Sequence, residues 1–476
     1  MLFDTPVYFV FLTIVVVCYW RLRRGGQNVL LLGASYLFYG WWDWRFLGLI
    51  LLSTLVDYFC AHLIDRSDDP IKRRMALIVS VGLNLGFLGF FKYFNFFIDS
   101  FSTMMSTLGL PVSDTTLQIL LPPGISFYTF QAVAYIVDVY KRRLKPADSL
   151  VDYALFISLF PHLIAGPIQR PSHLLPQVQA ARVFEIDKFY SGLQLIAMGL
   201  FRKVVIADNC ALLADAAFSG KLGEPNLAVL AIGAYAFAWQ IYGDFSGYSD
   251  IARGSAQLMG FHFMVNFKQP YLATSLQDFW RRWHISLSSW LRDYLYISLG
   301  GNRHGEVKTY RNLMTTMLLG GLWHGANWTF VIWGGIHGAG LAVERFGRRL
   351  LGLETADGAA QGSSSFVSVW LSRIVIFHLV CLSWVFFRAT SVGEAFHMLS
   401  GIGRIEWIPE YGTAFIFLIA FSLPMFLLDL LNERRGEEYV FEGLPAMKRV
   451  AVAMSLMFAV LIFAGSSANA FIYFQF

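Results

Sequence analysis

The amino-acid sequence predicts an all-α protein that crosses a membrane many times. Of its 476 residues, 56% are hydrophobic and only 14% are charged, whereas soluble chains carry about 25% charged residues. The apolar residues gather in runs close to the roughly 20 residues that a membrane-spanning helix needs. The basic residues lie in short clusters between those runs, so the net charge of +5 is not the footprint of a nucleic-acid binder. The same composition excludes a disordered protein and an ordinary soluble enzyme.

Twelve apolar runs follow one another along the chain, and each is expected to be helical. They lie at roughly 7–20, 28–42, 44–64, 75–98, 117–140, 151–168, 189–212, 226–248, 313–343, 366–388, 413–431 and 449–465. Because one or two of these runs are short or broken, we expect about ten or eleven transmembrane helices, with re-entrant and interfacial helices beside them.

Basic residues indicate the orientation of these helices. They follow the first, third and fifth runs, at 21–24, 66–74 and 141–145, whereas the loop at 99–116 contains no Lys or Arg. Basic loops stay in the cytoplasm, so the pattern predicts an N-terminus outside. The first basic cluster comes after the first apolar run, so we expect no cleavable signal peptide.

Proline and glycine interrupt several runs. Breaks are expected at 121–124 (LPPG), 160–162 (FPH) and 165–167 (AGP), and seven glycines lie within 320–340. A single glycine most often indicates tight helix packing. We interpret their density as the mark of a cavity or tunnel lined by protein, because backbone that leaves a helix at membrane depth must be sheltered. The polar stretch at 352–365 is expected to be a loop.

The cysteines and histidines give no metal-binding pattern. Cys18, Cys60, Cys210 and Cys381 are scattered inside apolar segments, where cysteine usually packs as a small hydrophobic residue. The histidines form no H-x3-H or H-E-x-x-H pair. We therefore expect no disulfide framework and no metal site.

An aromatic stretch at 278–297 is expected to be one interfacial helix. Its Trp, Leu and Tyr side chains recur every three or four residues, and its charged residues fall elsewhere. His284 lies beside the apolar face, where an imidazole needs a partner or a wet pocket. The alternative is a helix that merely lies on the cytoplasmic surface.

A second histidine, His324, lies in the middle of the glycine-rich run. Asn327 is three residues later, on the same helical face, and could hold the imidazole in one tautomer. His337 is 13 residues from His324, which is about 220° around a helix. The two histidines therefore cannot share a face if the helix is continuous.

These residues favour acyl transfer over other chemistries. The sequence has no G-x-S-x-G elbow and no G-x-x-x-x-G-K loop. A neutral histidine can take the proton of a hydroxyl that attacks a thioester. Basic residues such as Arg281, Arg282 and Arg303 could meet the phosphates of a coenzyme A donor.

Two other function classes stay open at this point. A transporter or flippase for a polysaccharide or a lipid-linked sugar would account for the aromatic residues and the broken helices. It predicts inverted repeats or a charged substrate pathway, and the sequence displays neither. A non-catalytic scaffold for a biosynthetic complex is supported only by the large helical surface.

Long motifs resemble the membrane-bound O-acyltransferases, and most closely the bacterial branch that includes the alginate O-acetylation membrane subunit. The most specific are DFWRRWHISLSSWLRDYLYISLGGNRHG at 278–305 and LLGGLWHGANWTFVIWGGIHG at 318–338. Shorter matching stretches begin near the N-terminus and continue through the chain, at 31–42, 89–97, 121–140, 160–170 and 242–254.

The resemblance implies a single membrane domain over 1–476, with helices around a central tunnel. Its N-terminal helices would occupy 7–140, its catalytic core 151–345 and its C-terminal helices 366–476. His324 falls on the catalytic histidine of the family, and His284 falls on the second active-site position. Further residues of the site would be those that wall the tunnel, support the histidines or bind substrate: Asn327, Trp323, Trp283, Asp244, Tyr248, Arg281 and Arg282.

The resemblance also implies the substrates and the location. Acetyl-CoA in the cytoplasm would be the acyl donor, and no cofactor would be bound. The acetyl group would cross the bacterial inner membrane for O-acetylation of a polysaccharide of the alginate, cellulose or peptidoglycan type. The partners would be membrane lipid, a periplasmic SGNH-type acetyltransferase with a serine nucleophile and a polysaccharide biosynthesis complex, with no nucleic acid.

Overall fold

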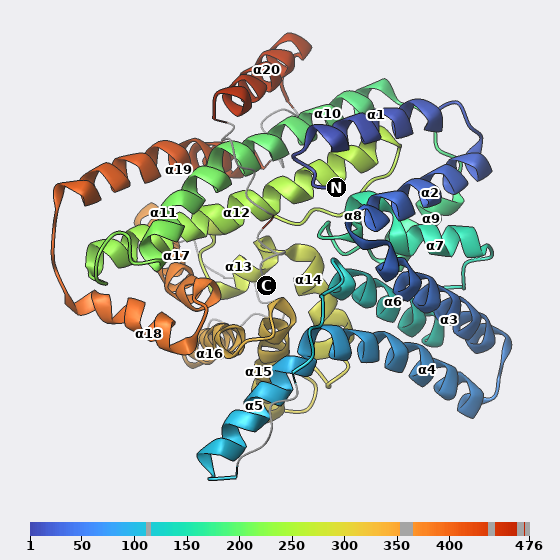
Figure 1. Ribbon diagram of the computed structural model, residues 1–476, viewed down its shortest axis with the longest axis horizontal. Coiled ribbons are helices and arrows are strands. Elements are labelled where there is room, and N and C mark those ends of the chain that lie inside the picture. The colour runs from blue at the N-terminus through green and yellow to red at the C-terminus, as the bar shows by residue number, and fades with distance from the viewer. Residues whose placement is uncertain (111–115, 353–364, 437–442, 464–470, 472–476) are drawn as a thin grey trace. The chain divides into compact units, whose positions relative to one another are not determined.

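The computed structural model describes residues 1–110, 116–352, 365–436, 443–463 and 471. Within those ranges the chain forms helices joined by irregular segments and contains no strand (Figure 1). It packs as two compact units, Met1–Ala197 with Tyr248–Met264, and Met198–Gly247 with Val265–Phe476. The long helix α12 (Leu227–Leu258) contributes to both units. The loop expected at 352–365 lies almost wholly outside the described residues.

The first unit is built from the N-terminal helices. Short 3-10 and π segments, η1 (Trp44–Phe46) and η2 (Gly89–Tyr93), interrupt them. The helices are α1 (Pro6–Tyr19), α2 (Arg24–Asp43), α3 (Leu47–Arg66), α4 (Pro70–Leu88), α5 (Phe94–Thr107), α6 (Ile125–Tyr140), α7 (Leu150–Ser158), α8 (Phe160–Leu163), α9 (Pro171–Gln179) and most of α10 (Ile186–Leu200).

The second unit contains the remaining helices and both predicted histidine sites. Its irregular helical segments are η3 (Phe201–Ala207), η4 (Pro270–Leu272), η5 (Leu291–Tyr296) and η6 (Gly401–Gly403). Its helices are α11 (Asp208–Phe218), α13 (Leu276–Arg282), α14 (Ile285–Trp290), α15 (Glu306–His324), α16 (Trp328–Leu350), α17 (Phe366–Arg388), α18 (Val392–Ser400), α19 (Pro409–Arg435) and α20 (Ala446–Phe463).

The breaks predicted from proline and glycine are present. Helix α6 begins at Ile125, directly after Gly124, whose φ is +74°. A Cβ at Gly124 would lie 2.4 Å from the Leu163 carbonyl oxygen, so both the turn and the close approach require glycine. Helix α7 ends at Ser158, and Pro161 lies in the first turn of α8, as the missing amide proton of proline favours.

A buried carboxylate holds the first unit together between α3, α4 and α7. The carboxylate oxygens of Asp57 accept hydrogen bonds from Ser80 Oγ at 2.5 Å, Asn84 Nδ2 at 2.9 Å and Tyr153 Oη at 3.3 Å. A charge or polar group buried at membrane depth must be hydrogen-bonded. These bonds therefore explain how an apolar helix tolerates Asp57.

Helices α15 and α16 cross with their backbones in contact. A Cβ at Gly321 would lie 2.2 Å from the Phe330 carbonyl oxygen, and one at Gly334 would lie 2.3 Å from the Met317 carbonyl oxygen. Small residues permit this kind of approach. Gly321 and Gly334 thus serve helix packing, as expected for single glycines, and the tunnel that we inferred from their density stays a prediction.

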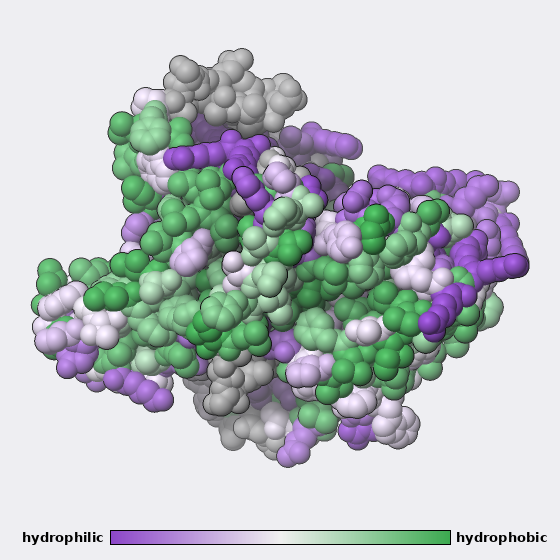
Figure 2. Space-filling view, turned by 90° about the horizontal axis from the view of Figure 1, so that it is seen from above, coloured by the Kyte–Doolittle hydropathy of each residue, from purple (hydrophilic) through white to green (hydrophobic). Residues whose placement is uncertain are grey.

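The surface of the chain is that of a membrane protein. Apolar residues make up much of the face in Figure 2, and large side chains such as Val10, Ile14 and Val29 are about half exposed or more. Soluble monomers rarely expose contiguous apolar patches of more than a few hundred Å². The protein is therefore an all-α polytopic membrane protein.

Five helical stretches of the described chain are long and apolar enough to cross a membrane. The first two, with 43 and 38 residues, are longer than one crossing of a hydrocarbon core of about 30 Å requires, and η1 and η2 interrupt them. The total of about ten or eleven crossings stays a prediction. The five stretches are Arg24–Arg66, Pro70–Thr107, Phe366–Arg388, Pro409–Arg435 and Ala446–Phe463.

Candidate active site

His284 occupies a sharp turn between two short helices. Its backbone is left-handed, with φ 43° and ψ 53°, and it separates α13 from α14. The single helix expected over 278–297 is therefore wrong, and the chain continues through α14 into the π segment η5. A left-handed residue with a Cβ is strained and usually persists where the surroundings fix it. The turn buries the imidazole completely.

A hydrogen bond to Asn266 fixes the tautomer of His284. His284 Nδ1 lies 3.1 Å from Asn266 Oδ1. The same oxygen accepts hydrogen bonds from the backbone N–H of Ser286 at 3.3 Å and from its hydroxyl at 2.9 Å. Because a backbone N–H can only donate, the amide atom facing it is oxygen, and the imidazole must donate from Nδ1. Nε2 of the neutral ring then carries the lone pair.

Burial keeps this imidazole neutral. The turn lies outside the membrane-spanning stretches, and desolvation lowers the pKa of His284 to about 3. At neutral pH the ring is thus an acceptor at Nε2, which is the state that a general base or a hydroxyl-orienting group requires.

His324 is the last residue of α15. The backbone then extends through Gly325, with φ −159°, and α16 begins at Trp328 after its N-cap, Asn327. Asn327 Oδ1 accepts from the Thr329 N–H at 3.0 Å, and its Nδ2 donates to the Thr390 carbonyl oxygen at 2.9 Å. The helical face that we expected His324 and Asn327 to share does not exist, because the helix ends between them.

The imidazole rings of His284 and His324 lie close together. The ring centroids of His284 and His324 are 6.4 Å apart, at an angle of 59°. Trp323 lies beside both, with its centroid 5.9 Å from that of His284 and 5.0 Å from that of His324. The end of α15 and the turn before α14 place side by side the two histidines that the family resemblance assigns to one active site, and their roles there stay a prediction.

Aromatic side chains enclose both histidines. The Phe245 ring lies 4.6 Å from the His284 ring. The rings of Trp333 and Phe387 lie 5.1 Å and 5.2 Å from that of His324. Such walls exclude water and strengthen the electrostatic interactions inside them. Trp283 is also buried, and it stacks on Phe279 at 5.6 Å.

His337 joins the same aromatic cluster because the helix is broken. Trp333 contacts it at 4.9 Å and thus touches both His324 and His337. His337 Nε2 lies 3.0 Å from Ser383 Oγ, whose own proton goes to the Val380 carbonyl oxygen at 2.7 Å. Ser383 must then accept from His337. Sequence spacing had separated the two histidines on the assumption of one continuous helix.

The other predicted site residues are distributed differently. Arg282 is bound by carboxylates, with Asp278 at 2.8 Å and Glu433 at 2.7 Å, whereas Arg281 is exposed. Asp244 Oδ1 lies 3.0 Å from Lys203 Nζ. Tyr248 belongs to the first unit, where its ring stacks on that of Phe3 at 4.3 Å.

Sequence reasoning missed four residues that build the site. These are Asn266, which sets the tautomer, and the aromatic neighbours Phe245, Trp333 and Phe387. Asn266 and Phe245 could have been suspected, since the stretches 239–250 and 266–301 in which they lie carry polar residues among apolar ones. Nothing in the sequence separates Trp333 or Phe387 from other buried aromatics.

Comparison with known proteins decides the family. Residues 147–386 match the model of the membrane-bound O-acyltransferase family. The probable alginate O-acetylase AlgI of Azotobacter vinelandii is 39% identical over 100% of both chains. The chain belongs to the membrane-bound O-acyltransferase family. It is therefore an O-acyltransferase and a multi-pass membrane protein.

Other members of the family extend the similarity. The probable alginate O-acetylase AlgI of Pseudomonas putida is 46% identical over 84% of this chain and 79% of its own length. The peptidoglycan O-acetyltransferase of Helicobacter pylori is 34% identical over 100% of this chain and 98% of its own length. The matched region 147–386 contains both histidines and the walls of Trp323, Trp333 and Phe245.

Proposed function

We propose that this O-acyltransferase takes acetyl groups from cytoplasmic acetyl-CoA and passes them across the inner membrane of a bacterium for O-acetylation of an extracytoplasmic polysaccharide. The observation that carries the proposal is the pair of buried imidazoles, His284 and His324, with ring centroids 6.4 Å apart. The names of the relatives, which concern alginate and peptidoglycan, support the acceptor class.

His324 acts as the general base in this proposal. It takes the proton of the acceptor hydroxyl while the hydroxyl oxygen forms a bond to the acetyl carbon. The bond between that carbon and the sulfur of the thioester then breaks, and the proton returns to the leaving thiolate. One well-placed base contributes about 10²–10⁴-fold to the rate. The WHG motif of the family, on which His324 falls, supports this assignment.

His284 binds a neighbouring hydroxyl of the acceptor. Its Nδ1–H is held by Asn266, so Nε2 accepts the proton of that neighbouring hydroxyl, while the proton of the attacking hydroxyl goes to His324. An acceptor molecule bound in this way is oriented before it reacts, which lowers the entropic part of the barrier. Trp323, in contact with both rings, keeps water away from the thioester.

The remaining steps concern access and partners. A tunnel through the membrane domain would bring the donor thioester and the acceptor to this site from opposite sides. Arg281, which is exposed, is available for the phosphates of coenzyme A, whereas Arg282 is committed to Asp278 and Glu433. A periplasmic SGNH-type acetyltransferase would carry the acetyl group to the polysaccharide.

Replacing His324 tests the proposal. The chain is reconstituted in nanodiscs with acetyl-CoA labelled in its acetyl group, polysaccharide fragments, and the SGNH-type partner present or absent. We expect His324→Ala to lose acetyl transfer by at least about 10²-fold. His397→Ala removes an exposed histidine from α18 of the same unit and should keep the parent rate.

Two results would count against the enzyme as proposed. Transfer by His324→Ala at the parent rate would remove the base from the mechanism. Movement of unacetylated sugar across the bilayer that does not depend on His324 would favour the transporter alternative.

A further inference from the structure

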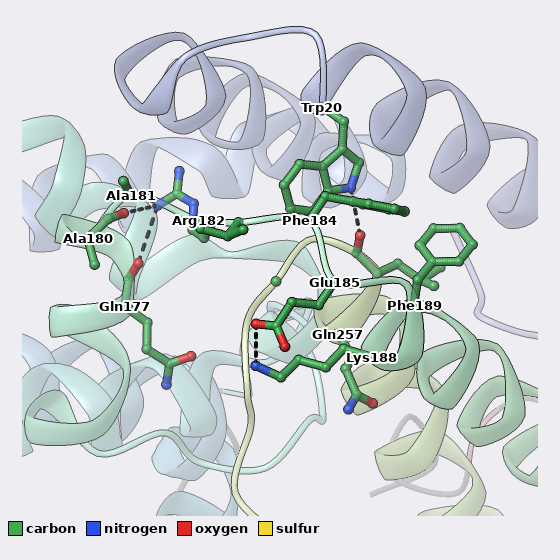
Figure 3. A pocket seen from close by; sticks show the side chains of 13 residues that line it. Trp20, Gln177, Ala180, Ala181, Arg182, Phe184, Glu185, Lys188, Phe189 and Gln257 are labelled. Carbon is green, nitrogen blue, oxygen red and sulfur yellow. Dashed lines mark hydrogen bonds and ion pairs between the residues drawn. The ribbon is translucent and has the colours of Figure 1, made fainter.

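A separate cavity lies in the first unit, between the end of α1, the link from α9 to α10 and the end of α12. It has a volume of about 230 Å³. Trp20, Phe184, Glu185, Lys188 and Gln257 are among the residues that line it (Figure 3). Because pockets for drug-sized ligands measure about 300–1,000 Å³, this cavity suits a small polar group and not a whole nucleotide.

The cavity is lined by one ammonium group, one carboxylate and one amide oxygen that can accept a further hydrogen bond. Lys188 Nζ lies 2.7 Å from Glu185 Oε1, and both side chains are more than half exposed. Gln257 Oε1 is buried, and no hydrogen bond reaches it from the described part of the chain. Figure 3 shows the Glu185 and Lys188 side chains reaching toward each other, with Gln257 close to Lys188. A buried acceptor without a donor is unfavourable, so it calls for a ligand that donates.

The side chain of Arg182, which also lines the cavity, is hydrogen-bonded to other groups of the protein. Arg182 donates to Tyr19 Oη at 2.7 Å, to Asn28 Oδ1 at 2.5 Å and to the Val178 carbonyl oxygen at 2.9 Å. The charges facing the cavity are thus balanced. A polyphosphate ligand would need an excess of positive charge, whereas a zwitterion matches one lysine and one glutamate.

The cavity lies where hydrocarbon meets water. The apolar helix α1 ends at Tyr19, and exposed arginines follow Trp20, a pattern typical of a cytoplasmic membrane boundary. On α10, Ile186, Tyr190 and Leu193 are spaced i, i+4, i+7, with exposed fractions of 50%, 57% and 43%. They form one apolar face of α10, whose first residue directly follows Glu185 of the cavity lining.

We propose that this cavity binds the headgroup of a phosphatidylethanolamine-type lipid. The phosphate pairs with Lys188, and the ammonium donates to the Glu185 carboxylate and to Gln257 Oε1. The acyl chains lie along the apolar face of α10. The ion pair between Lys188 and Glu185 is exposed and therefore weak, so a zwitterion can exchange it for two ion pairs of its own.

Lipid retention by the purified full-length chain tests this site. Native mass spectrometry is run with lipids of identical acyl chains whose headgroups are phosphoethanolamine, its mono-, di- and trimethylated forms, and phosphoglycerol. We expect retention to fall as methyl groups replace N–H donors, with about a tenfold difference between the first and the trimethylated lipid. The anionic lipid should be retained less than phosphatidylethanolamine.

Variants assign the binding to the cavity. Glu185→Gln, Lys188→Gln and Gln257→Met should each reduce the preference for phosphatidylethanolamine. The matched control, Lys221→Gln with Glu224→Gln, changes an exposed lysine and glutamate of the second unit and should leave it unchanged. Equal retention of all headgroups by the parent chain, or a preference that survives the three variants, would overturn the proposal.

Free phosphoethanolamine separates the lipid from a soluble ligand. It should compete weakly, because it cannot use the apolar face of α10. Full competition by it would show that the cavity serves a soluble zwitterion and that the lipid assignment is wrong. None of these measurements requires acetyl transfer, so their outcome is independent of the proposed function.

Discussion

At the scale of single residues, the site depends on which nitrogen of His284 carries the proton. Asn266 Oδ1 accepts from His284 Nδ1–H and from both donors of Ser286. An amide oxygen held by three donors cannot rotate away without leaving some of them unsatisfied. The lone pair of His284 therefore stays at Nε2, and the left-handed turn at His284 fixes where that lone pair points.

Removing Asn266 should weaken catalysis more than binding. In Asn266→Ala the imidazole loses its fixed tautomer, and we expect kcat to fall roughly ten- to a hundredfold with KM little changed. Ser286→Ala removes only a hydroxyl donor to the same oxygen, so it should stay close to the parent rate. Steady-state kinetics of acetyl transfer measure both. Equal losses in the two variants would indicate general damage to the fold.

Acid should destabilise the protein in part through His284. Burial lowers the pKa of His284 to about 3 from its ordinary value of about 6.5, so the unfolded chain binds this proton first as the pH falls. Above about pH 6.5 this imidazole is neutral in both states, so the free energy of unfolding does not depend on it. Below that pH, protonation of the unfolded chain lowers the free energy of unfolding by about 1.4 kcal/mol per pH unit. Thermal unfolding in detergent between about pH 7 and pH 5 should show less acid sensitivity for His284→Gln than for the parent. Identical acid sensitivity of His284→Gln and the parent would contradict this prediction. The variant His397→Gln, which changes an exposed histidine, is the control.

At the scale of helices, the crossing of α15 and α16 places His324. The backbones touch at Gly321 and Gly334, and His324 ends α15 one turn beyond Gly321. The break at Gly325–Asn327 then reverses the chain into α16, so Trp333 returns to pack against His324. The glycines of this crossing thus position His324 of the candidate site through helix packing.

Two adjacent glycines of α16 provide a matched test of this crossing. A Cβ at Gly334 would lie 2.3 Å from the Met317 carbonyl oxygen, whereas one at Gly335 would meet Leu318 Cδ2 at an ordinary 3.5 Å. Gly334→Ala should therefore force the helices apart, destabilise the protein by about 1–3 kcal/mol and reduce acetyl transfer.

Gly335→Ala is the control for the crossing. Alanine favours a helix interior over glycine by about 1 kcal/mol, so this variant should be as stable as the parent or more so. Thermal shift and acetyl-transfer assays on both variants decide the matter. Similar behaviour of the two would mean that the crossing tolerates a Cβ and that the contact does not place His324.

At the scale of the whole molecule, the distribution of charge determines how the chain lies in the bilayer. Apolar side chains cover much of the face in Figure 2, so lipid is the solvent for that part. Polar groups inside the units, such as Asp57, are hydrogen-bonded by neighbours. The exposed basic residues at 21–24 and at 66, 72 and 74 are predicted to face the cytoplasm.

Labelling from each side of the membrane tests this orientation. In a chain without its native cysteines, Asp68→Cys lies in an exposed link after α3, and Ser106→Cys lies near the exposed end of α5. We expect an impermeant maleimide to label Cys at position 68 only from the cytoplasm and Cys at position 106 only from outside. Labelling of both positions from one side would contradict the predicted topology.

The sequence by itself determined the class of the protein, most helix locations and the two histidines. Apolar runs and prolines suffice for this, because helix length in a bilayer and the missing proline donor are local constraints. The breaks after Gly124 and at Pro161 were predicted for that reason. His284 and His324 were found because an ionisable group in an apolar segment is expensive and therefore conspicuous.

Only the tertiary structure decided how those histidines are placed relative to each other. Periodicity assumes a continuous helix, and it failed at His284 and at Gly325, where the left-handed turn and the cap of α16 interrupt the helices. Asn266, Trp333 and His337 reach the site through such interruptions. Contacts between segments distant in sequence depend on packing, which no local pattern encodes.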